Sequence, residues 1–203
     1  MRKIFLAIIT VFALVLSGCS INAVSGSFPE TVSDPVVEPV STEMPDIVFK
    51  KCIAYNRYEH NFDYDDSAEQ DRYLLTFLDK NGNYYSSTDS EIYGLSNEEL
   101  IEKLKSGDER ITKSSVSCDA DELRENFDKL LKAAENKEYE LVYPEAVPAV
   151  EDDHITWYGL YYDKDGKLSS LPIHEHKQCT EIEANDNRAN EIYKWYAGAV
   201  KKQ

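Results

Sequence analysis

The chain has few basic residues for its length. Its 22 lysines and arginines stand against 38 aspartates and glutamates, which gives a formal net charge of −16. Proteins bind nucleic acid largely by neutralising phosphates with cationic side chains. An anionic membrane leaflet likewise attracts clusters of lysine and arginine. The deficit of positive charge therefore excludes nucleic acid as a partner and argues against a domain that lies flat on an anionic membrane.

The sequence also lacks the short motifs that mark common active sites. It contains no G-x-S-x-G, S-x-x-K or H-E-x-x-H pattern and no glycine-rich phosphate loop. Each of these patterns places a nucleophile, a metal ligand or a phosphate at a defined turn or helix end. Without them the sequence does not define a reaction, and we expect no catalytic residue and no cofactor.

Long hydrophobic runs are scarce, and the clearest one is too short to cross a bilayer. Ile4–Leu16 is thirteen residues without a charge. At 1.5 Å per residue it forms a helix of about 20 Å, short of the hydrocarbon core of about 30 Å. Arg2 and Lys3 precede it, as in the positive region of a signal peptide. We therefore interpret residues 1–18 as a signal peptide.

The end of this run carries a more specific pattern, Leu16-Ser17-Gly18-Cys19. It resembles the lipobox of bacterial lipoproteins, in which leucine, a small residue and glycine or alanine precede a cysteine. The resemblance implies that a diacylglyceryl group is attached to Sγ of Cys19 and that signal peptidase II cleaves after Gly18. Two acyl chains give stable anchoring, because each buried CH₂ contributes about 0.8 kcal/mol. We expect a protein anchored by lipid to the cell membrane, on its extracytoplasmic side.

The segment after Cys19 has the composition of a disordered tether. Residues 20–46 hold four of the seven prolines and five acidic residues but no basic residue. Proline and charge of one sign favour an extended, self-repelling chain. We therefore divide the chain into a signal peptide (1–18), a lipidated cysteine with its tether (19–46) and a single acidic domain (47–203).

Two β-hairpins are predicted within the domain from the turns Asp79-Lys80-Asn81-Gly82 and Asp163-Lys164-Asp165-Gly166, each flanked by β-rich runs. The turns are offset by 84 residues. An internal duplication of a β-hairpin–helix unit would explain the match, and so would shared turn chemistry. Residues 47–58 alternate as a further strand, and Ile111–Cys118 is a short polar strand typical of a sheet edge.

Helix signals fall between and after these hairpins. Capping boxes are predicted at Ser96 with Glu99 and at Asp119 with Glu122, each followed by an amphipathic run. A last helix covers about Asp186–Val200. The order of elements predicts an α+β fold, an antiparallel sheet of hairpins with about three amphipathic helices on one face.

The C-terminal part carries a second resemblance. WYGLYYDKDGKLSSL, followed by NRANEIYKW, is similar to uncharacterised small lipoproteins of gram-positive bacteria. The similarity covers about forty residues. It implies an envelope location and brings no activity with it.

The run LPIHEHKQC is the strongest candidate for a metal site. In a strand, His174 and His176 project to one face, so the pair can chelate Zn²⁺ or Cu²⁺. Cys179, His154 or His60 would supply a third ligand. The spacing matches no closed zinc signature, and two solvent-facing histidines on an exposed strand are the simpler interpretation.

Two other groups of residues can bind metal or form covalent links. The acidic run Asp63–Asp71 offers oxygen ligands for Ca²⁺, but it lacks the glycine and the final glutamate of an EF-hand loop, so we favour a solvated loop.

Three cysteines follow Cys19, namely Cys52, Cys118 and Cys179, and we expect them to lie outside the cytoplasm, where disulfides can form. They allow one disulfide, for which Cys52 with either partner is preferred, or three thiols.

Together these patterns predict a lipid-anchored cell-envelope protein with a non-catalytic extracytoplasmic domain. The domain would bind a protein, a peptide or a glycan, with exposed aromatics of Trp157–Tyr162 and a sheet edge as contacts. The alternative is a metal-dependent enzyme or a metal-binding lipoprotein that uses His174 and His176.

Overall fold

The computed structural model describes residues 41–55, 72–144, 154–177 and 180–200. The signal peptide, Cys19, the tether to residue 40 and the acidic run 63–71 lie outside the described residues. The elements follow one another as β1 (Ile47–Tyr55), β2 (Arg72–Asp79), β3 (Asn83–Ser87), α1 (Ser90–Tyr93), α2 (Asn97–Ser106), β4 (Thr112–Ser117), α3 (Ala120–Ala134), β5 (His154–Tyr162), β6 (Leu168–Lys177), β7 (Thr180–Glu183) and α4 (Asn187–Val200).

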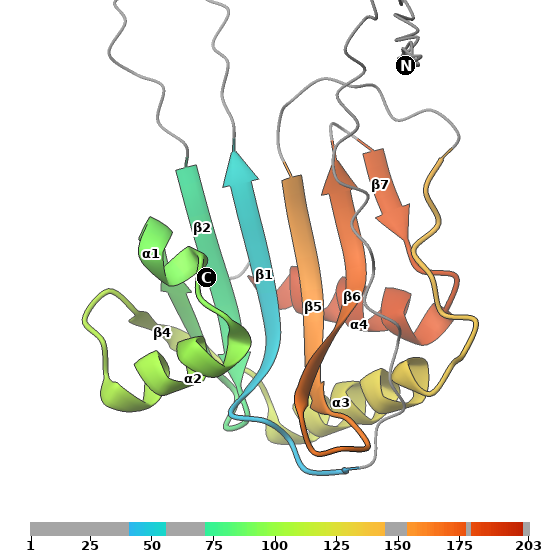
Figure 1. The fold of residues 1–203 in the computed structure, drawn as a ribbon, viewed down its shortest axis with the longest axis horizontal. Helices are drawn as coiled ribbons and strands as arrows, with labels where there is room; N and C mark the ends of the chain where they lie inside the picture. The colour runs from blue at the N-terminus through green and yellow to red at the C-terminus, as the bar shows by residue number, and fades with distance from the viewer. Residues whose placement is uncertain (1–40, 56–71, 145–153, 178–179, 201–203) are drawn as a thin grey trace, which may run out of the picture. The chain divides into compact units, whose positions relative to one another are not determined.

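The strands form one sheet of seven, in the order β4-β3-β2-β1-β5-β6-β7 (Figure 1). Every neighbouring pair is antiparallel. β1 lies at the centre and pairs with β2 on one side and β5 on the other. The polar strand β4 forms one edge, as its sequence predicts. The α+β class with an antiparallel sheet is therefore confirmed.

Among the described residues, helices cover both faces of the sheet. α3 and α4 lie behind it in Figure 1, and their Phe127 and Tyr196 belong to one core cluster. α1 and α2 lie in front, where Leu100 packs in a second cluster. We expected helices on one face. The neighbouring residues Phe77 and Leu78 of β2 show why both are covered, because these two buried side chains point into different clusters.

The N-cap residues that the sequence predicts, Ser96 and Asp119, lie where α2 and α3 begin. Ser96 and Glu99 form a complete capping box at α2, and Gly107 ends this helix in a left-handed conformation with φ of 69°. Asp119 caps α3 by accepting hydrogen bonds from the backbone N–H groups of Asp121 and Glu122. The carboxylate of Glu122 accepts a hydrogen bond from Nε1 of Trp195 on α4 at 3.3 Å.

The two hairpin turns have the same hydrogen-bond pattern. Asp79 and Asp163 each accept, through Oδ1, from the backbone N–H groups two and four residues later, at 2.8–2.9 Å. Gly82 and Gly166 have φ of 81° and 73°, which glycine adopts without strain. The aligned residues Phe77 and Tyr161 nevertheless lie in different core clusters. Shared turn chemistry thus accounts for the match at the turns, and the duplication stays a prediction.

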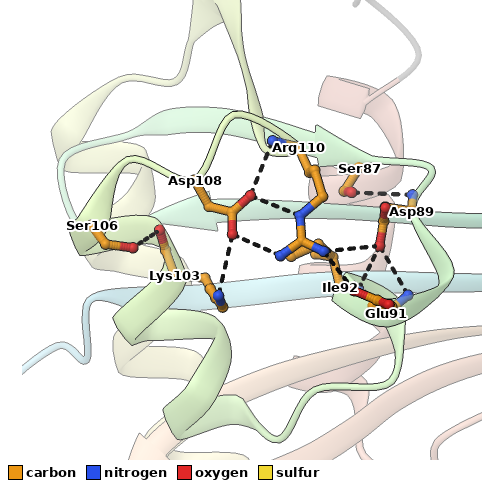
Figure 2. A network of polar contacts seen from close by, with 8 residues as sticks. All are labelled: Ser87, Asp89, Glu91, Ile92, Lys103, Ser106, Asp108 and Arg110. Atoms are coloured by element: carbon orange, nitrogen blue, oxygen red, sulfur yellow. Dashed lines mark hydrogen bonds and ion pairs between the residues drawn. The ribbon is translucent and has the colours of Figure 1, made fainter.

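A polar network centred on Arg110 fastens α1 and α2 to the segment before β4 (Figure 2). Its guanidinium donates to both oxygens of Asp108 at 2.9 and 2.8 Å and to Glu91 at 2.8 Å. Lys103 Nζ lies 3.3 Å from the same Asp108 carboxylate. The hydrogen bonds from Arg110 hold the pKa of Asp108 well below its ordinary value. The cationic side chains of Arg110 and Lys103 are paired with the carboxylates of Asp108 and Glu91, so the network is explained by its structural role.

The last residues of the predicted tether contact the domain. The carboxylate of Asp46 lies 2.7 Å from Lys80 Nζ and 3.0 Å from Lys105 Nζ, and its backbone oxygen accepts from the N–H of Lys80 at 3.2 Å. Met44 packs against the core under α3 and α4. The chain is therefore fixed to the domain immediately before β1 begins.

Cys52 and Cys118 are free thiols on opposite sides of the sheet. Cys52 packs with the core under α1 and α2, and Cys118 packs with the core under α3 and α4. Burial raises the pKa of both thiols, that of Cys118 to about 11. A Cys52–Cys118 disulfide is therefore wrong, and Cys179 lies outside the described residues.

The contact between Gly159 of β5 and Leu130 of α3 gives a test of this packing. A Cβ on Gly159 of β5 would lie 2.4 Å from Cδ1 of Leu130 on α3, far inside van der Waals contact. We expect Gly159→Ala to lower the free energy of unfolding by about 1–3 kcal/mol, because the buried Leu130 side chain has to be displaced in a packed core. Urea unfolding measures this change.

The matched control is Gly198→Ala on α4, where an added Cβ meets no atom within 4 Å. There the helix propensity of alanine should raise the free energy of unfolding by up to about 1 kcal/mol. A Gly159→Ala protein as stable as the parent would show that α3 does not pack on β5 in this way.

Candidate functional site

The two histidines of the H-x-H run lie on one face of β6 and meet at one carboxylate. His174 is paired in the sheet with Glu183 of β7, and His176 with Glu181. Glu181 contacts both rings, with Oε2 against Nε2 of His174 and with Oε1 at 3.2 Å from Nδ1 of His176. The antiparallel register thus places two imidazoles and two carboxylates together on the β6–β7 edge.

The two rings have different surroundings. The side chain of His174 is 1% exposed, whereas that of His176 is 26% exposed. The His174 ring stacks on Tyr193 of α4 with 3.6 Å between ring centroids, and it forms a T-shaped pair with Trp157 at 5.2 Å between centroids. The interpretation of two solvent-facing histidines is therefore wrong for His174, which belongs to the core.

The protonation of this cluster follows from burial and charge. Burial lowers the pKa of His174, although the hydrogen bond to Glu181 acts in the opposite direction. Burial raises the pKa of Glu181, but its hydrogen bonds to the two histidines outweigh this and lower it. Because an ionised carboxylate only accepts hydrogen bonds, Nε2 of His174 is the donor. Nδ1 of His174 is buried without a hydrogen-bond partner.

His154, one of the proposed third ligands, lies on the opposite face of the sheet. It pairs with Lys177, and its Nε2 is 3.1 Å from Oγ1 of Thr156 and 3.8 Å from Oε2 of Glu175. His60 and Cys179 lie outside the described residues. Within the described ranges, no group of three or more His, Cys, Asp or Glu side chains is placed so that it could hold a metal ion.

A second polar cluster, centred on Glu175, occupies that opposite face. Lys177 Nζ lies 3.0 Å from Oε2 of the buried Glu175, and the hydroxyl of Tyr143 donates to the same oxygen at 3.1 Å. Burial alone would raise the pKa of Glu175, but the neighbouring His154 and Lys177 side chains lower it to about 2. Sequence reasoning missed this cluster. The i, i+2 spacing of Glu175 and Lys177 was its one local signal.

The aromatic run of β5 divides between the two faces. Trp157 and Tyr161 point into the core under α3 and α4, whereas Tyr158 and Tyr162 pack with the other cluster and stay partly exposed. Lys50 Nζ lies 5.0 Å from the ring centroid of Tyr158. These aromatics therefore serve mainly in packing. Among the described residues, the large apolar side chains that are exposed are Val142 and Tyr143.

Comparisons with known proteins give no match to this chain. No protein-family model matches the chain, and no curated protein or solved structure matches it significantly. None of the helices in the described ranges is long and apolar enough to span a membrane.

The Glu175 cluster predicts a specific acid sensitivity. The folded-state pKa of the Glu175 carboxyl group is about 2, below its ordinary value of 4.5, so the ionised carboxylate stabilises the fold at neutral pH. This contribution is complete above about pH 4.5 and is lost as the pH falls towards 2. We expect Glu175→Gln to cost about 1–3 kcal/mol at pH 7, with the difference from the parent closing near pH 2.

Urea unfolding at a series of pH values measures this difference. Lys177→Met is the matched variant, because without the ammonium group the pKa of Glu175 should rise and the loss of stability should begin at higher pH. A parent-to-variant difference that stays constant from pH 7 to pH 2 would contradict the assignment.

Proposed function

We propose that the chain is a lipid-anchored protein of the cell envelope whose α+β domain binds a ligand on the extracytoplasmic side. The observation that carries this proposal is the sequence Leu16-Ser17-Gly18-Cys19 at the end of a short apolar run. In this proposal the lipid on Cys19 holds the protein at the membrane, and residues 20–46 separate the domain from it.

The attachment of the tether to the domain supports this arrangement. Asp46 forms ion pairs with Lys80 and Lys105, and Met44 packs on the core. A tether fixed in this way joins the folded domain at one point, directly before the central strand β1.

The edge strand β4 is the best-supported binding surface for this domain. It pairs with β3, and among the described residues no strand lies on its other side. An edge strand presents unpaired backbone N–H and C=O groups, to which an extended peptide can add as a further strand. Lys113 is the one charged residue in β4, so this edge is free of the negative charge that dominates the chain. We therefore assign an extended segment of another envelope protein as the ligand.

The anchoring is tested by Cys19→Ala. Without the sulfur no diacylglyceryl group can be attached, so we expect the variant to leave the washed membrane fraction and to keep its signal peptide unprocessed. Fractionation, immunoblotting and mass spectrometry of the N-terminus measure both effects. Ser17→Ala is the control, because it keeps a small residue in the box and should behave as the parent does. Parent-like membrane retention and processing of Cys19→Ala would overturn the anchor.

The binding surface is tested with a photo-crosslinking amino acid placed at Ser115 on β4 of the full chain in living cells. We expect a discrete crosslinked band at this exposed edge position. Lys132, exposed on α3, is the control position and should give none. Equal crosslinking at both positions, or none at Ser115, would remove the support for a β4 interface.

A further inference from the structure

A buried histidine ring joins the last helix to the sheet. His174 of β6 is 1% exposed, and its ring stacks on Tyr193 of α4. We propose that this pair is a pH-sensitive contact between the sheet and α4, in which uptake of one proton at Nδ1 of His174 loosens the turn of the helix around Tyr193. This inference goes beyond the proposed binding function and does not rest on it, because β6 lies towards the opposite end of the sheet order from β4.

The ring of His174 is enclosed by aromatic groups. Its centroid lies 3.6 Å from that of Tyr193, with 5° between the two planes, and 5.2 Å from that of Trp157, with which it forms a T-shaped pair. Trp157 and Tyr193 also form a T-shaped pair, at 5.0 Å between centroids. The three rings come from β5, β6 and α4 and pack on one another, so a displaced His174 ring would disturb both of its neighbours.

The two ring nitrogens of His174 have different surroundings. Nε2 donates a hydrogen bond to the carboxylate of Glu181, whereas Nδ1 is buried and has no hydrogen-bond partner among the described residues. The neutral ring suits this arrangement, because its Nδ1 carries a lone pair and no proton. A second proton would turn Nδ1 into a buried donor without an acceptor, which costs about 1–3 kcal/mol.

Three titratable side chains face the ring from the two strands. Glu181 and Glu183 of β7 favour an added proton, whereas His176 of β6 opposes it. Burial of His174 is the largest effect and outweighs the two glutamates, so the pKa of His174 lies below its ordinary value of 6.5. The pKa of Glu181 is also lowered from its ordinary 4.5, so this carboxylate stays ionised at pH 5 and above.

Two further side chains face the rings from α4 and β1. Tyr193 stays neutral below pH 7, because burial raises its pKa above the ordinary value of 10. The face of a tyrosine ring attracts a cation, which favours a protonated His174. Lys51 Nζ lies 5.2 Å from the ring centroid of Trp157, and its positive charge opposes a second charge on the neighbouring His174 ring.

Acid therefore favours local opening of this contact. Folded domains open locally, and an opened contact lets water reach Nδ1, so that His174 takes up a proton at its ordinary pKa. In the packed form the same proton binds less well, so the packed form is fully favoured above pH 6.5 and loses stability as the pH falls from 6.5 towards the lowered pKa. This range lies above that of Glu175, whose contribution is lost below about pH 4.5.

Other contacts keep the helix attached, so the expected change is local. Asn190 exchanges hydrogen bonds with the backbone of Ala184 at 2.9 and 3.2 Å. The hydroxyl of Tyr196 donates to the backbone oxygen of Thr76 at 3.3 Å, and burial keeps this phenol neutral by raising its pKa. These contacts lie one turn before and one turn after Tyr193. We therefore expect loosening around Tyr193 without unfolding of the domain.

NMR spectroscopy of the full chain, purified in detergent, tests the proposal. The Cε1–H resonance of His174, assigned by its loss in His174→Phe, should titrate with a midpoint below pH 6.5. Amide exchange, corrected for its intrinsic dependence on pH, should show protection around Tyr193 falling at least about threefold from pH 7 to pH 5, with protection of β1 unchanged. A midpoint at or above pH 6.5, or unchanged protection around Tyr193, overturns the proposal.

Three variants assign the effect to this ring. His174→Phe keeps an aromatic ring that cannot titrate, so protection around Tyr193 should no longer depend on pH. Glu181→Gln removes the nearest negative charge and should move the His174 midpoint to lower pH. It changes a side chain that is 54% exposed, so it decides the question where circular dichroism shows that His174→Phe is not folded. His154→Gln, on the opposite face, is the control and should behave as the parent does.

Three results would contradict the assignment to His174. They are a folded His174→Phe protein with the pH dependence of the parent, a Glu181→Gln midpoint that stays or rises, and a response that is lost in His154→Gln.

Discussion

The pairing of β1 with strands on both of its sides is the constraint on which the rest of the structure depends. β2 and β5 are far apart in the sequence, and each pairs with β1 over most of its length. Side chains of a central strand alternate between two faces, and here both faces carry large apolar groups. Such a sheet is stable only when both faces are covered, which is why α1 and α2 pack on one face and α3 and α4 on the other.

The same alternation separates the two polar clusters of β6. His174 and His176 face α4, whereas the intervening Glu175 faces the other side with Lys177. One strand therefore supplies a histidine pair to one face and a buried carboxylate to the other. Each group has a partner from a neighbouring strand or loop: Glu181 for the histidines, and His154 and Tyr143 for Glu175.

The parts of the fold that were predictable from the sequence are those that local chemistry determines. Asp79 and Asp163 bind backbone groups within four residues, and Ser96 and Glu99 close their capping box within three. Such contacts need only short spacing, so the sequence reveals them. α1 escaped prediction because it is a single turn of four residues, held by Asp89 as its cap and by Arg110 from a distant segment.

The candidate site was predictable only in part, for a related reason. The spacing of His174 and His176 indicates that they share a strand face, but not whether a helix covers it. Tyr193 of α4 covers His174, and no pattern within β6 reports the position of that helix. Glu181 was equally hidden, because its pairing with His176 depends on how β7 turns back along β6. Long-range register, rather than residue type, is the information that the sequence did not display.

The acidity of the chain has a consequence for how the domain meets its surroundings. Several cations in the described residues are engaged with carboxylates, as in the pairs of Asp46 with Lys80 and Lys105 and in the Arg110 network. The remaining negative charge repels an anionic bilayer. A protein of this kind gains little from electrostatic contact with a membrane, so stable attachment there requires a hydrophobic anchor. The lipid that we propose on Cys19 would provide such an anchor, and the proline-rich acidic segment after it would keep the charged domain away from the lipid surface.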